Sequence, residues 1–144
     1  MAEIRVENIV ASASIADYLD LDEVSSALSE SEYDPDTFKG VILRIRERGL
    51  RTSVLLFNSG KIVCTGAKIV EDIKKTMEYL QDKLSSKGIK VKDEINFKVQ
   101  NMVATSDLGG NLNLASVALT LGLERIEYEP EQFPALMYRG SDYV

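Results

Sequence analysis

The sequence predicts an α+β fold in which helices cover one face of an antiparallel sheet built from a direct repeat. Three observations lead to this prediction. A segment of about ninety residues occurs twice, several short segments carry apolar side chains at alternate positions, and one long segment carries them at helical spacing. The repeat is much longer than a solenoid unit, so it predicts two half-domains related by a pseudo-twofold axis.

The repeat is visible at two offsets. NIVAS at 8–12 returns as NMVAT at 101–105, an offset of 93, and EYDPDTFKG at 32–40 returns as EYEPEQFPA at 127–135, an offset of 95. We therefore expect a first repeat at 1–93 and a partial second repeat at 94–144. At the second offset Val144 corresponds to Gly49, so the second repeat is expected to be truncated, without counterparts of the segments that follow residue 49.

Strands are predicted where apolar residues alternate along the first repeat. The segments are 4–11, 41–46, 53–57 and 61–66, and Asn58-Ser59-Gly60 is the expected hairpin turn between the last two.

Helices are predicted from caps and from helical spacing. Asp20 is the expected N-cap of a first helix, Glu23 completes a capping box, and Asn113 takes the cap position in the second repeat. A longer helix is expected from near Lys68 to Gly88. Its apolar stripe consists of Val70, Ile73, Met77, Leu80 and Leu84.

Alternation divides the predicted sheet into two faces. The face expected to lie under the helices carries Val41, Leu43, Ile45, Val54, Leu56, Ile62 and Cys64. The opposite face carries Ile42, Arg44, Arg46, Leu55, Phe57, Lys61, Val63 and Thr65. In segment 4–11, alternation adds Asn8 and Val10 to this second face and turns Arg5 and Glu7 away from it. Apolar surface rimmed by basic side chains indicates a binding face, and a broad sheet suits the shallow minor groove of DNA.

Charge is distributed unevenly along the 144 residues, which carry a net charge of −6. Residues 39–68 hold seven basic side chains and one acidic one, whereas residues 17–36 hold eight acidic side chains and no Lys or Arg. Such a run is ordinarily a solvated face, but it also suits a protein that offers one surface to a polyanion and another to a basic partner. We expect no membrane partner, because no apolar run approaches the length of a span. The N-terminus has no secretion signal, so an intracellular protein is expected.

The sequence indicates neither an enzyme nor a metal or cofactor site. It has no histidine, no metal-ligand spacing and no phosphate-cradling glycine loop, and paired carboxylates such as Asp34 and Asp36 are the only residues that an enzyme could use. The single cysteine, Cys64, excludes an intramolecular disulfide and is interpreted as a small core residue.

Three motifs together resemble the TATA-box-binding protein family in its archaeal form. They are VENIVAS at 6–12 with VQNMVAT at 99–105, the two Tyr-acid-Pro-acid-x-Phe stretches, and LLFNSGKIVCTGAK at 55–68. The resemblance covers both repeats. It implies a curved saddle, to which each complete repeat contributes a five-stranded antiparallel sheet and two helices on the convex side. The concave side would bind and bend the TATA element in the minor groove, as a general transcription initiation factor in the archaeal cytoplasm and nucleoid, or in the nucleus of a eukaryote.

The resemblance also implies roles for particular side chains. Asn8 and Asn101 would hydrogen-bond to minor-groove acceptors of the central A·T pairs, and Thr65 would donate to a base acceptor. Apolar contacts with base edges and sugars are implied for Val10, Leu55, Val63 and Val103. Wedges that unstack base steps are implied for Phe38 with Phe57, and for Phe133. Phosphate contacts are implied for Arg44 and Arg139, with Lys61 and Lys68 in support.

The second acidic stretch has a different implied role. Glu129, Glu131 and Gln132 resemble the loop contacted by transcription factor B, which in turn recruits RNA polymerase, and acidic side chains suit a basic docking surface. A second copy of the chain is a further candidate partner for the apolar face when DNA is absent.

Alternative interpretations remain at this point. The three Phe residues could be core residues, the two Asn residues could satisfy local backbone groups, and Glu129 and Glu131 could be solubilising charges. The alternative function is a truncated or divergent saddle that acts as a protein-interaction module without competent DNA binding.

Overall fold

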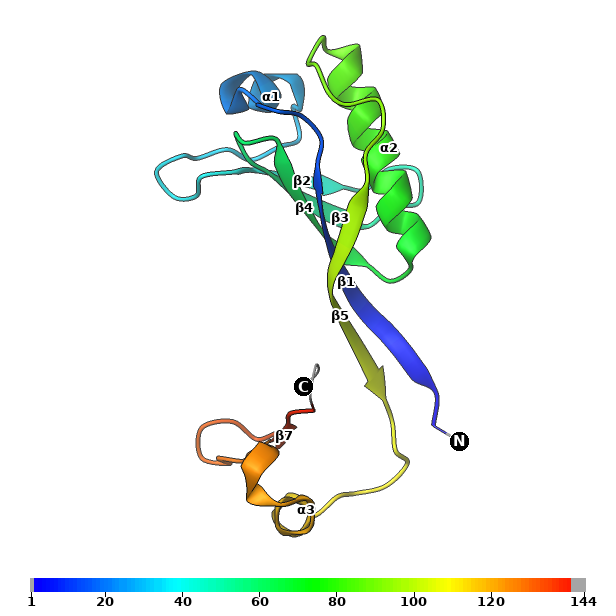
Figure 1. Ribbon diagram of the computed structural model, residues 1–144, viewed down its shortest axis with the longest axis vertical. Coiled ribbons are helices and arrows are strands. Elements are labelled where there is room, and N and C mark those ends of the chain that lie inside the picture. The colour runs from blue at the N-terminus through cyan, green and yellow to red at the C-terminus, as the bar shows by residue number, and fades with distance from the viewer. Residues whose placement is uncertain (1, 141–144) are drawn as a thin grey trace. The chain divides into compact units, whose positions relative to one another are not determined.

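The computed structural model describes residues 2–140, without the side chain of Leu123, and it forms two compact units (Figure 1). One unit spans Glu3–Ser106 and the other spans Asp107–Val144. Residues 141–144, where the predicted second repeat ends, lie outside the described residues. The boundary between the units differs from the predicted repeat boundary because strand β5 belongs by sequence to the second repeat but pairs within the first unit.

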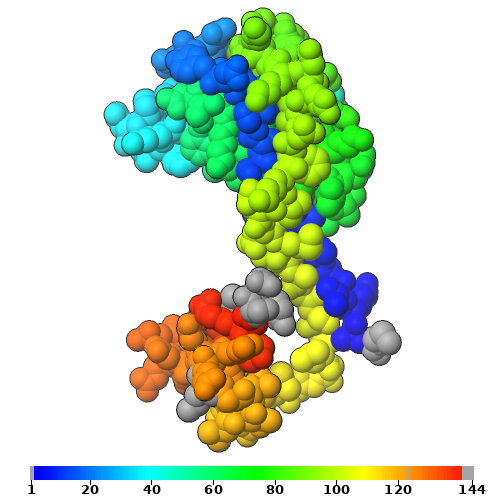
Figure 2. All heavy atoms as spheres, viewed as in Figure 1, coloured from blue at the N-terminus to red at the C-terminus, as the bar shows by residue number. Residues whose placement is uncertain are grey.

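The first unit is built on a five-stranded antiparallel sheet with strand order β2-β3-β4-β1-β5. Its strands in chain order are β1 (Ile4–Ser14), β2 (Val41–Ile45), β3 (Thr52–Leu56), β4 (Lys61–Ala67) and β5 (Phe97–Ser106). Four of these strands were predicted within the first repeat, and the fifth comes from the second. In Figure 2, β5 runs beside β1 along the unit.

Two helices lie on one side of this sheet (Figure 1). Helix α1 (Leu21–Ala27) is capped by Asp20, whose carboxylate accepts from the backbone N–H groups of Asp22 and Glu23. Helix α2 (Val70–Ser86) starts two residues later than its predicted beginning near Lys68. Val70 is exposed, contrary to its predicted place in the apolar stripe, because the buried face of the helix begins one turn later.

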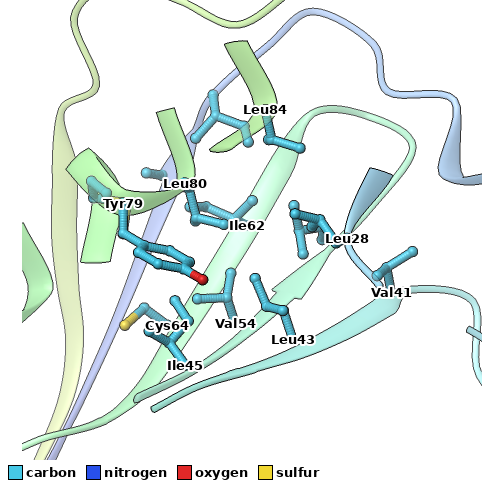
Figure 3. Packing of buried hydrophobic residues seen from close by; sticks show 14 of the residues in the cluster. Leu28, Val41, Leu43, Ile45, Val54, Ile62, Cys64, Tyr79, Leu80 and Leu84 are labelled. Carbon is cyan, nitrogen blue, oxygen red and sulfur yellow. The ribbon is translucent and has the colours of Figure 1, made fainter. Parts of the chain in front are cut away.

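The core lies between the helices and the sheet face that was predicted to be apolar. All seven predicted residues of that face are buried, none more than 1 % exposed. Figure 3 shows side chains of α2 above this face, and Tyr79 and Thr76 extend the predicted helical stripe. Burying this many aliphatic groups is the main stabilising contribution to a domain of this size.

The second unit contains α3 (Leu114–Leu121), the 3-10 helix η1 (Leu123–Arg125), β6 (Ile126–Glu127) and β7 (Met137–Tyr138). The predicted cap is confirmed, because the Asn113 side chain accepts from the N–H of Ser116 at 3.1 Å. Among the described residues, this unit buries little apolar surface, and Leu119 of α3 is 79 % exposed.

Candidate nucleic-acid interface

The sheet face opposite the helices is called the open face here. Its side chains are half-buried or exposed, and those on β1 to β4 include Asn8, Val10, Ile42, Arg44, Leu55, Val63 and Thr65. Strand pairing aligns them in rows: Ile42 lies opposite Leu55, which lies opposite Val63. The open face therefore has an apolar strip across three strands, and contiguous apolar surface of this kind is typical of an interaction site.

A polar row lies beside the apolar strip. Arg44 pairs with Ser53, which pairs with Thr65. Thr65 lies next to Asn8, whose Oδ1 accepts from the backbone N–H of Gly66 at 2.7 Å and lies 3.3 Å from the Thr65 hydroxyl. The Asn8 oxygen is thus occupied by the protein, as the local-backbone interpretation predicts. The same bonds fix the amide plane, so the NH₂ group is an oriented donor, and its Nδ2 lies 3.3 Å from Thr65 Oγ1.

The β1–β5 pairing forms a pseudosymmetric seam. Ile9 lies opposite Met102, Asn8 opposite Val103, and Val10 opposite Asn101. The repeat offset of 93 relates Asn8 to Asn101, Ile9 to Met102 and Val10 to Val103. It therefore converts the Asn8–Val103 pair into the Val10–Asn101 pair and the Ile9–Met102 pair into itself. A pseudo-twofold axis therefore passes between Ile9 and Met102, and the two asparagines lie on either side of it.

Two β-bulges interrupt the seam at equivalent places. In β1, Val6 pairs with Ala104 and Asn8 pairs with Val103, so Glu7 between them is unpaired. In β5, the residues on either side of Gln100 pair with Val10 and Ala11, so Gln100 is unpaired. Simple alternation along 4–11 therefore assigned the wrong face to the residues that precede Asn8. Val6 packs against the core rather than sharing a face with Asn8. A bulge adds one residue to a strand and so reverses which side chains face each side.

The bulge also overturns the prediction that Glu7 turns away from the open face. Its Oε1 accepts from the Thr105 hydroxyl at 3.0 Å, and its Oε2 lies 3.7 Å from Lys68 Nζ. The equivalent Gln100 donates from Nε2 to Ser12 Oγ at 2.8 Å. The seam thus carries a carboxylate at one bulge and a neutral amide at the other.

Phe38 and Phe57 form an edge-to-face pair at the end of the first unit's sheet. Their ring centroids are 6.0 Å apart with an interplanar angle of 66°. Phe38 is 38 % exposed, so the core interpretation does not hold for its ring. Gly40 allows this arrangement, because a Cβ there would lie 3.0 Å from Phe38 Cε1 and 3.1 Å from Phe57 Cε1.

The two acidic stretches form loops with the same backbone hydrogen bonds. In the first, Phe38 N–H donates to Asp34 C=O at 2.9 Å, and in the second, Phe133 N–H donates to Glu129 C=O at 2.9 Å. A hydrogen bond from the Thr37 hydroxyl, helped by the Asp36 backbone N–H, lowers the pKa of Asp34. Phe133 is 53 % exposed. Each loop therefore presents a partly or largely uncovered aromatic ring.

Each predicted phosphate-binding arginine is paired with the first residue of its acidic stretch. Arg44 Nη1 lies 2.6 Å from Glu32 Oε1, and Arg139 Nε lies 3.2 Å from Glu127 Oε1. Both ion pairs are solvent-exposed, so they orient the arginines but contribute little to the free energy of folding. Lys61 is exposed at the start of β4.

Comparison with known proteins decides the family. The family described as "Transcription factor TFIID (or TATA-binding protein, TBP)" matches residues 3–87 and 96–143. The chain belongs to the TATA-box-binding protein family. The "TATA-box-binding protein" of Picrophilus torridus is 52% identical over 142 residues, which are 99% of this chain and 76% of that protein. The one from Archaeoglobus fulgidus is 49% identical over 137 residues, 95% of this chain and 74% of that protein.

A solved structure agrees with the family assignment. "Methanococcus jannaschii TBP" superposes with a TM-score of 0.85 and 43% sequence identity, covering 97% of this chain and 78% of that one. The predicted α+β fold with the architecture of the TATA-box-binding protein family is therefore confirmed, as is the resemblance to its archaeal members.

In this member of the TATA-box-binding protein family, the structure brings most predicted site residues of the first unit onto the open face. Asn8, Val10, Leu55, Val63 and Thr65 lie there together, and Asn101 and Val103 join them through the seam. Phe133 and Arg139 lie in the second unit, as do Glu129, Glu131 and Gln132. Whether any of these residues contacts DNA or a protein stays a prediction.

Sequence reasoning missed two residues on the open face. Arg5 and Lys98 belong there, because the bulges at Glu7 and Gln100 reverse the alternation. The repeat itself carried a signal for this, since Arg5 and Lys98 are equivalent basic residues at the offset of 93.

Other chemistry finds little support in the described part of this family member. No group of three His, Cys, Asp or Glu side chains there could hold a metal ion, and no helix there is long and apolar enough to span a membrane. Burial raises the pKa of the Cys64 thiol to about 11, which is far from the lowered pKa of a nucleophilic cysteine.

Proposed function

We propose that this protein is a general transcription initiation factor that binds the TATA box in the minor groove of DNA and bends it. The relatives of known name are TATA-box-binding proteins that match nearly the whole chain. The proposal places DNA on the open face and the protein at the nucleoid of an archaeal cell. It includes no enzymatic activity and no cofactor.

The observation that carries the proposal is the seam, where two equivalent asparagines flank a pseudo-twofold axis beside an apolar strip. An A·T pair presents only acceptors in the minor groove, and a G·C pair adds a donor amine. The amide of Asn8, held by the Gly66 backbone, and the amide of Asn101 carry donors that fit acceptors, and Val10, Leu55 and Val63 leave no partner for an amine. The open face therefore favours A·T pairs at its centre.

The aromatic loops supply the bending. Phe38 and Phe57 would enter one base step as a pair, and Phe133 would enter another. Each insertion would unstack the bases and kink the duplex toward the major groove. The arginines Arg44 and Arg139 would exchange their glutamate partners for phosphates, with Lys61 and Lys68 in support.

The proposal also covers a protein partner and a domain division. Glu129, Glu131 and Gln132 would bind a basic surface of transcription factor B, which recruits RNA polymerase. The two repeats, 1–93 and 94–144, would share the DNA task while the second loop alone serves this partner.

The test is a fluorescence anisotropy titration of a TATA duplex and a G·C-substituted duplex at stated salt concentrations. We expect tighter binding to the TATA duplex and a negative slope of log K against log salt. Equal affinity for the two duplexes would contradict sequence-specific binding. If transcription factor B still bound in that case, the protein-interaction alternative would be favoured.

A pair of variants separates the implied roles. Phe57→Ala should reduce the bend, measured by energy transfer between dyes at the duplex ends, more than it reduces the salt slope. Arg44→Ala should do the opposite, because its contact is ionic. If both variants changed the two quantities alike, the assigned roles would be wrong.

A further inference from the structure

The two bulges bring a basic side chain onto the open face at each end of the seam. Val6, next to Arg5, and Phe97, next to Lys98, pack against the core. Neighbouring side chains in a strand point to opposite faces, so Arg5 and Lys98 point to the open face. Without the bulge at Glu7, Arg5 would share the core-facing side of β1 with Ile9.

These two residues are equivalent under the pseudo-twofold axis. Arg5 lies four residues before Ile9, and Lys98 lies four residues before Met102. Because one of the four residues is the unpaired bulge residue, Arg5 lies opposite Thr105 and Lys98 lies opposite Ser12, each three residues from the axis pair. At about 3.3 Å per residue, each therefore lies roughly 10 Å from the axis. The strands are antiparallel, so the two side chains lie in opposite directions from it.

Both side chains are free to meet an external anion. Arg5 and Lys98 are exposed, and within residues 2–140 neither takes part in an ion pair with a carboxylate. Lys68 differs, because Glu7 already lies 3.7 Å from its Nζ. The Glu7 carboxylate is therefore engaged with Lys68 and Thr105 rather than with Arg5.

We propose that Arg5 and Lys98 form a symmetric pair of contacts to DNA backbone phosphates, one on each strand of the duplex whose minor groove lies on the seam. The inference rests on the proposed function, which places DNA on this face. The two strands of a duplex run antiparallel, as β1 and β5 do, so aligned twofold axes bring the equivalent side chains to opposite strands. Such contacts add affinity and fix the position of the protein, and they carry no sequence information.

The pair also explains how a protein with a net charge of −6 can hold a polyanion centrally. The basic run at 39–68 lies to one side of the seam, on β2, β3 and β4, whereas Arg5 and Lys98 frame the seam itself.

The test compares Arg5→Gln, Lys98→Gln and the double variant with Lys75→Gln, an exposed lysine on α2 that serves as the matched control. Anisotropy titrations with a TATA duplex and a G·C-substituted duplex would be run from low to high salt. Each single variant should flatten the slope of log K against log salt by about 0.9 and weaken binding about eightfold at 0.1 M salt. The double variant should lose about twice the slope.

The preference for TATA over G·C should be unchanged in these variants, because phosphate contacts do not read bases. Circular dichroism melting curves show whether each variant is folded. Slopes of Arg5→Gln and Lys98→Gln equal to that of Lys75→Gln would overturn the inference. If the parent chain binds both duplexes equally, the proposed function fails, but the salt slopes of the variants still test the contacts of Arg5 and Lys98. If the parent chain binds neither duplex, both the proposed function and this inference are contradicted.

Discussion

Thr105 donates a hydrogen bond to Glu7 across the seam, and the distance from Thr105 Oγ1 to Glu7 Oε1 is 3.0 Å. The same contact recurs on the other side of the pseudo-twofold axis, where Gln100 donates to Ser12 at 2.8 Å. The geometry is repeated while the chemistry differs, since Glu7 is an anion and Gln100 is neutral. The two halves of an otherwise symmetric seam therefore differ by one negative charge on the open face.

Glu7→Gln should strengthen DNA binding, because it removes a negative charge from the open face and releases Lys68 from its ion pair. The effect should be equal for TATA and G·C duplexes, and the salt slope should become steeper by up to about 0.9, as for one added phosphate contact. Anisotropy titrations check this. Gln100→Glu is the matched control and should have the opposite effect. Weaker binding by Glu7→Gln would mean that the carboxylate itself supports the complex.

Gly40→Ala should disturb the aromatic pair. A Cβ at this position would lie 3.0 Å from both Phe38 Cε1 and the Leu56 carbonyl oxygen, and the backbone atom cannot move aside cheaply. Overpacking of this kind costs about 1–3 kcal/mol. We expect a lower free energy of unfolding in urea and a smaller DNA bend. Gly110→Ala is the control, because nothing lies within 4 Å of its added Cβ, and an equal loss in both variants would exclude the packing explanation.

Ile9 and Met102 are equivalent in sequence and face each other, yet Ile9 is 2 % exposed and Met102 is 51 % exposed. Ile9→Ala should therefore cost about 2–5 kcal/mol of stability, since it leaves a cavity in the core. Met102→Ala should cost less than about 1 kcal/mol. Urea unfolding monitored by circular dichroism measures both. Similar losses would show that another segment or a second copy covers Met102 in solution.

Cys64 should resist thiol reagents in the folded protein. Burial raises the pKa of its thiol from 9.0 to about 11, and a hydrogen bond from Thr76 offsets only part of this. Below pH 9 the thiol is neutral in both the folded and the unfolded state. Between pH 9 and 11 only the unfolded chain ionises, so stability is lost in that window, by up to about 3 kcal/mol.

Urea unfolding at pH 8, 9, 10 and 11 measures this loss, and Cys64→Ala is the control because it cannot ionise. The control should lose less stability over the same window, after correction for its cavity. The same dependence on pH in both proteins would mean that the thiol is not the group responsible. Reaction with a thiol reagent at pH 8 should be slow for the native chain and fast in denaturant.

The strands, the apolar sheet face and the caps could be predicted from local patterns, because each depends on side-chain spacing or on a few neighbouring backbone groups. Asp20 and Asn113 cap helices as predicted. Alternation failed at Glu7, since a bulge is decided by the strand that pairs with it and not by the strand's own sequence.

The sequence by itself determined the family, the direct repeat, the core of the first unit and most of the open face, because periodicity and motif spacing are properties of the chain. Only the tertiary structure decided that β5 joins β1, that two bulges turn Arg5 and Lys98 onto the open face, and that Met102 is exposed where Ile9 is buried. These features depend on pairing between segments about ninety residues apart. Register and burial at such a distance follow from which surfaces meet in space, and no local pattern encodes them.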